Sequence, residues 1–96
     1  MASDANPYRA LMTTRIDLVV RLTELNSRRL STEGRLGGID FEMARRRDAA
    51  DGATDGVEAL RGERRALLDV REDIDRQCEE LEADLARVDA RIGELQ

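Results

Sequence analysis

Acidic side chains are the most abundant groups in this 96-residue sequence that could do chemistry. Eight of them lie between Asp69 and Asp84, and carboxylate oxygens at that density can bind a divalent cation weakly. Metal sites in helical bundles normally add histidines from Glu-x-x-His pairs, and the chain has no histidine. Neither a serine nor the single cysteine, Cys78, therefore has an imidazole base to activate it. No glycine-rich phosphate loop follows a strand pattern, so we expect no enzyme activity, metal site or cofactor.

Arginine is the other candidate group, because all 16 basic residues are arginine and Arg45, Arg46 and Arg47 form one run of three. Such a run is usually a solvated cluster beside a turn, but it could contact an acidic protein surface or a phosphate. The net charge of −5 argues against nucleic acid as a main partner. A regulatory, nucleic-acid-associated dimer that uses this run is the alternative from another functional class.

A seven-residue repeat of apolar side chains runs through the whole chain. With Tyr8 at position a, 20 of the 26 a and d positions are apolar, against 19 of the other 70 residues. This spacing predicts long helices that pack lengthwise in a coiled coil. Asn6 and Pro7 are typical of a helix start. The predicted seam between the helices consists of Leu11, Leu18, Leu22, Leu25, Leu36, Leu67, Ile74, Cys78, Leu81, Leu85, Val88 and Ile92.

Two groups of glycines interrupt this repeat. Residues 51–56 contain two Asp-Gly pairs and predict a turn, and Asp55 stands three residues before Glu58 as in a capping box. Glycines at 34, 37 and 38 indicate a break or hinge in the first helix, or a place where another backbone approaches closely. The predicted organisation is a tail at 1–6, a first helical arm at 7–50, a turn at 51–56 and a second arm at 57–96.

Two architectures fit the repeat, and the seam arginines favour one of them. In a parallel coiled coil of single extended helices, residues such as Arg15 and Arg29 would each face their own copy. In an antiparallel hairpin, Leu36 meets Leu67, Arg29 meets Ile74, and no arginine faces another. We therefore predict an all-α fold, a long antiparallel helical hairpin coiled coil. The parallel rod, a spacer or filament element, is the alternative.

The first arm carries a second apolar stripe beside the seam. A helix that is apolar over two stripes must bury both, which predicts a dimer of hairpins or docking on another protein. We expect a cytoplasmic adaptor, stalk or assembly factor, because no stretch of about eighteen apolar residues could span a membrane, no export signal is readable in residues 1–8, and a lone cysteine suits a reducing compartment. The stripe consists of Met12, Ile16, Val19 and Leu30.

Overall fold

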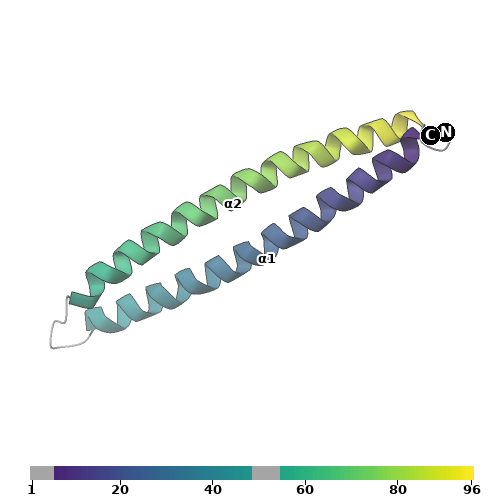
Figure 1. The fold of residues 1–96 in the computed structure, drawn as a ribbon. Helices are drawn as coiled ribbons and strands as arrows, with labels where there is room; N and C mark the ends of the chain where they lie inside the picture. The colour runs from purple at the N-terminus through teal and green to yellow at the C-terminus, as the bar shows by residue number, and fades with distance from the viewer. Residues whose placement is uncertain (1–5, 49–54) are drawn as a thin grey trace. The chain divides into compact units, whose positions relative to one another are not determined.

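The structure, a computed structural model, describes residues 6–48 and 55–96 as two long helices. Helix α1 spans Pro7–Asp48 and helix α2 spans Asp55–Glu94, and the described residues contain no strand (Figure 1). The all-α prediction is confirmed, and the chain has two helices in place of the single extended helix of the alternative. The predicted turn at 51–56 lies largely outside the described residues, and α2 begins at Asp55, two residues before the predicted second arm.

Helix α1 begins where its capping residue satisfies a free backbone amide. The side-chain Oδ1 of Asn6 accepts a hydrogen bond from the backbone N–H of Arg9 at 3.2 Å. Pro7 occupies the first helical position, where a missing N–H costs nothing. At the other end, Arg45, Arg46 and Arg47 lie in the last turn, where positive charge is favourable beside the free carbonyls.

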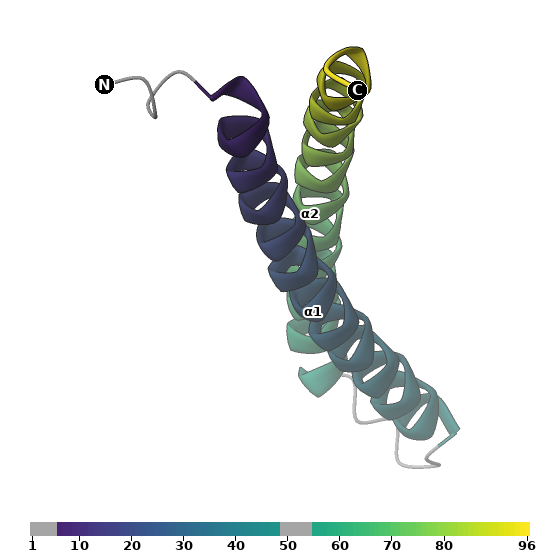
Figure 2. The same ribbon diagram turned by 90° about the vertical axis from the view of Figure 1, so that its right-hand side faces the viewer.

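The glycines at 34, 37 and 38 do not interrupt α1. The helix continues through them without a break, as both views in Figures 1 and 2 show. An added Cβ at any of the three would meet nothing within 4 Å, so no neighbouring group in the chain requires glycine there. Hydrogen bonding along the helix outweighs a propensity cost of about 1 kcal/mol for each glycine.

The chain divides into two compact units, each containing one segment of α1 and one of α2. Unit 1 comprises the chain up to Asn26 and from Arg76 onward. Its buried side chains are Leu18, Leu25, Cys78 and Ile92. Arg15 of α1 donates from Nε to Oδ1 of Asp89 of α2 at 2.7 Å, which ties the two helical segments together.

Unit 2 comprises Ser27–Asp75 and contains the main hydrophobic cluster. Leu36, Ile39 and Leu67 are buried together, with Met43, Leu60 and Leu68 packed against them. Arg29 pairs with Asp75 at 2.7 Å and Asp40 pairs with Arg64 at 2.8 Å. The partner's number falls as the α1 number rises, so the two segments of unit 2 run antiparallel.

All buried residues among the described ones lie at the a and d positions of the repeat. Besides the apolar residues already named, they include Ile74, which is fully buried, and Thr32, whose hydroxyl donates to the carbonyl of Arg28 at 2.8 Å. Leu36 and Leu67, predicted to meet, belong to one cluster. Leu11, Leu22, Leu81, Leu85 and Val88 are half-buried. The heptad repeat thus identifies the residues that lie at the interface within each unit.

Three seam arginines, Arg15, Arg29 and Arg64, pair with carboxylates on the other helix. Helix α1 has nine arginines against six acids and α2 has seven against thirteen, so most cross-helix pairs join an arginine of α1 to an acid of α2. Arg29 shows the cost of this position, because its Nε is buried without a hydrogen-bond partner while Nη2 binds Asp75. An unpaired buried donor of this kind costs about 1–3 kcal/mol.

Candidate binding surfaces

An apolar face of α1 lies exposed in unit 1. Ile16, Val19 and Val20 are 59%, 38% and 50% exposed, and their i, i+3, i+4 spacing places them on one side of the helix. Met12, one turn earlier, is half-buried. The sequence predicted Met12, Ile16 and Val19 but missed Val20, which falls outside the second stripe. We call Ile16, Val19 and Val20 the α1 face; its side chains are β-branched and stiff.

Unit 2 exposes two apolar side chains on α1. Leu30, predicted as part of the partner surface, is 70% exposed, and Phe41, which the repeat did not identify, is 71% exposed. Gly34, Gly37 and Gly38 lie between them. Single exposed apolar residues of this kind are common, so neither marks a binding site by itself.

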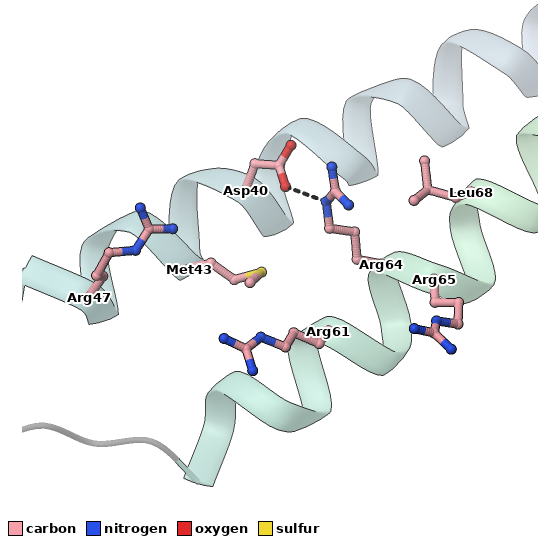
Figure 3. Close-up of a pocket in the computed structure, with 7 residues that line it drawn as sticks. All are labelled: Asp40, Met43, Arg47, Arg61, Arg64, Arg65 and Leu68. Atoms are coloured by element: carbon pink, nitrogen blue, oxygen red, sulfur yellow. Dashed lines mark hydrogen bonds and ion pairs between the residues drawn. The ribbon is translucent and has the colours of Figure 1, made fainter.

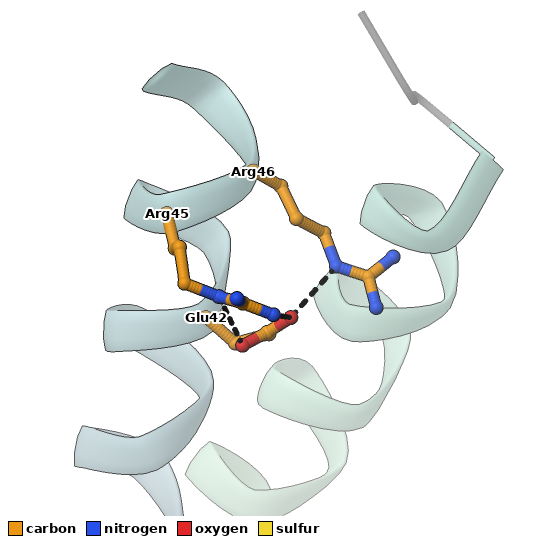
Figure 4. A network of polar contacts seen from close by, with 3 residues as sticks. All are labelled: Glu42, Arg45 and Arg46. Atoms are coloured by element: carbon orange, nitrogen blue, oxygen red, sulfur yellow. Dashed lines mark hydrogen bonds and ion pairs between the residues drawn. The ribbon is translucent and has the colours of Figure 1, made fainter. Parts of the chain in front are cut away.

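Glu42 pairs with two of the three arginines that the sequence indicated as a basic contact, and its single negative charge offsets one of their two positive charges. Its carboxylate accepts hydrogen bonds from Nε and Nη2 of Arg45 at 3.2 and 3.0 Å and from Nε of Arg46 at 3.1 Å (Figure 4). These bonds hold the pKa of Glu42 below its ordinary value and raise the pKa of Arg45. Arg46 also extends over Gly56 at the start of α2, so closely that an added Cβ there would collide with its guanidinium. Arg45, Arg46 and Arg47 therefore do not present three unpaired positive charges side by side.

Arg47, the third member of the run, lines a groove in unit 2 instead. The groove encloses about 560 Å³ between α1 and α2 (Figure 3). Sequence reasoning missed the arginines of α2 at this site, because they become neighbours of Arg47 only when the two helices pair. The lining residues are Asp40, Met43, Arg47, Arg61, Arg64, Arg65 and Leu68.

The acidic residues of α2 do not gather into a metal centre. Within residues 6–48 and 55–96, no three or more histidine, cysteine, aspartate or glutamate side chains are placed to hold an ion. Cys78 is 2% exposed and lies in the interior of unit 1. Neither α1 nor α2, over the part described, has an apolar stretch of the length that a membrane crossing requires.

Comparison of the chain with protein families, curated proteins and solved structures gives no significant match.

Proposed function

We propose that this protein is a non-enzymatic protein-interaction module, an antiparallel coiled-coil hairpin that associates with a second copy of itself through the α1 face. The observation that carries the proposal is the exposure of Ile16, Val19 and Val20 on a helix segment that already buries Leu18 and Leu25. Exposure of these apolar side chains to water is unfavourable, and contact with another apolar surface takes them out of water. A protein with this property acts as an adaptor, stalk or assembly factor.

The α1 face is small, so the proposed dimer is a weak one. Burying a half-exposed valine or isoleucine contributes about 1 kcal/mol, so the six side chains of two α1 faces contribute about 6 kcal/mol. Each side chain supplies a sizeable share of that sum, which makes association sensitive to the loss of any one of them.

Ile16→Glu with Val19→Glu tests the α1 face. The double variant places two carboxylates at the centre of the contact, and we expect it to remain monomeric at every concentration while its helix content is unchanged. Sedimentation velocity over a concentration series measures the mass, and circular dichroism measures the helix content.

The matched control is Ala86→Glu with Ala90→Glu, which adds the same charge to exposed positions of α2 in the same unit. This control should dimerise like the unmodified chain. A dimer that persists in the Ile16/Val19 variant would contradict the α1 face as the contact. A chain that stays monomeric without any substitution would contradict self-association and leave a different protein as the partner of this face.

A further inference from the structure

The side of α1 opposite its buried a and d positions carries a second seven-residue repeat. Positions b and f recur at alternating spacings of three and four residues, as a and d do, and lie on the other side of a helix. Between Thr13 and Ala44, ten residues are charged, and none of the ten lies at a b or f position. The b and f residues of this segment are all exposed, and we call them the b/f stripe: Thr13, Ile16, Val20, Thr23, Ser27, Leu30, Gly34, Gly37, Phe41 and Ala44.

The same positions of α2 have the opposite character. Between Glu58 and Glu79, six of the seven b and f residues are charged, and Gly62 is the exception. A helix face that remains in water is ordinarily charged and polar, as this face of α2 is. An uncharged stripe along about nine turns of α1 therefore indicates a face that another helix covers lengthwise.

Large and small residues are separated along the b/f stripe. Ile16 and Val20 are 59% and 50% exposed, and Phe41 toward the other end is 71% exposed. Gly34 and Gly37 precede Phe41, and a Cβ added at either glycine would meet nothing within 4 Å. A parallel pair of α1 helices would press the two copies of Phe41 together and leave gaps beside the glycines. An antiparallel pair places branched side chains opposite glycine, which gives closer packing.

One antiparallel alignment gives every residue of the b/f stripe another stripe residue as its partner. Position b of one helix then meets position f of the other. Val20 meets Gly37 and Ile16 meets Phe41, and the two-fold symmetry of the pair repeats each contact. The other stripe residues pair in the same way, so no charged residue enters the line of contact.

The neighbouring alignments are less favourable because of charge. A shift by one heptad in one direction brings Arg9 into the line of contact and places Glu24 opposite its own copy. A shift in the other direction brings in Asp48 and places Glu33 opposite its own copy. In the favoured alignment, no two like charges are opposed at the positions that flank the stripe.

Given the self-association proposed above, we infer that two α1 helices pair antiparallel along the b/f stripe, with the α1 face of each copy against Gly37 and Phe41 of the other. The stripe supplies both halves of this contact, so the occupant that it matches is a second copy of the chain. The glycine of one copy provides the space that the branched side chain of Val20 fills in the other.

Val20→Cys with Gly37→Cys tests the pairing through an interchain disulfide. The two positions lie about 25 Å apart along α1, too far for a bond within one chain, but each faces the other across the proposed pair. In a glutathione redox buffer, we expect the double variant to form a covalent dimer, and an equal mixture of the two single variants to do the same. Either single variant alone should remain uncrosslinked. Non-reducing electrophoresis measures the product, and the unmodified chain, whose Cys78 is buried, gives the background.

Gly34→Gln with Gly37→Gln tests the space beside the glycines. Glutamine favours the helix more than glycine does, so helix content should not fall, but its side chain occupies the space that the second copy needs. We expect the dimer to weaken roughly tenfold or more in sedimentation velocity. The matched control is Gly62→Gln with Gly93→Gln, at exposed positions of α2 with the same open space, and it should leave dimerisation unchanged.

The outcomes separate this pairing from self-association itself. A disulfide in the Val20→Cys variant alone would show that two α1 faces meet each other, which overturns the pairing and leaves self-association intact. Unchanged dimerisation of the Gly34/Gly37 variant would also overturn the pairing alone. An unmodified chain that is monomeric at every concentration would overturn both.

Discussion

Units 1 and 2 share one heptad repeat but present different chemistry to their surroundings. Unit 1 buries Leu18, Leu25, Cys78 and Ile92 and exposes β-branched side chains on α1. Unit 2 buries leucine and isoleucine in the same way but exposes a groove rich in arginine. The a and d positions therefore determine how the helices pair, while the remaining positions are free to differ. Ile16, Val19 and Val20 and three of the four groove arginines, Arg47, Arg61 and Arg65, lie outside the a and d positions.

The largest expected effect is a loss of stability when a buried side chain is shortened, and it shows whether the interiors of the two units are equivalent. Ile74→Ala in unit 2 and Leu18→Ala in unit 1 each remove a buried aliphatic side chain and should lower the free energy of unfolding by about 2–5 kcal/mol. Val70→Ala, at a position 39% exposed, should change it by less than about 1 kcal/mol. Urea denaturation followed by circular dichroism measures all three. A large cost in only one unit would show that the two interiors are not equivalent.

A smaller effect concerns the glycines, which are concentrated in unit 2. Replacing Gly34, Gly37 and Gly38 with alanine should raise the free energy of unfolding by about 2–3 kcal/mol in total, since each site has open space for a methyl group and alanine favours the helix. Thermal unfolding measures the gain. The reverse change in unit 1, Ala86→Gly with Ala90→Gly, should lower stability by about 2 kcal/mol. A destabilised alanine variant would mean that these glycines accommodate a contact absent from the isolated chain.

The smallest expected effect is a pH dependence specific to unit 2. The pKa of Glu42 in the folded chain lies below its ordinary value of 4.5, so near that pH the folded chain binds fewer protons at this group than the unfolded chain does. Its stabilising contribution is therefore complete above pH 4.5 and disappears as the pH falls through the lower folded value. Glu42→Gln should remove this part of the pH dependence, and the difference in unfolding free energy between the two proteins should shrink on acidification. A difference that is constant with pH would contradict the two hydrogen-bonded arginines as its cause.

The sequence predicted the two helices because a 3,4 spacing of apolar residues is a local signal, and the buried residues among those described all lie at a or d positions. Asn6, Pro7 and the residues around Asp55 likewise indicated where helices begin. Val20 and Phe41 were missed, since nothing in the spacing requires an apolar residue at those places. Arg61, Arg64 and Arg65 were missed for another reason. Their proximity to Arg47 depends on how the helices align, and the geometry of Glu42 determines that it binds Arg45 and Arg46 of the run.

The burial of Cys78 makes the reactivity of its thiol depend on the opening of unit 1. A thiol that is 2% exposed is protected from oxidants and alkylating reagents while the helices are paired. Modification requires the helices to separate locally, so its rate is governed by an opening equilibrium and not by the intrinsic nucleophilicity of sulfur. The only cysteine in the chain is thus a built-in probe of transient helix separation.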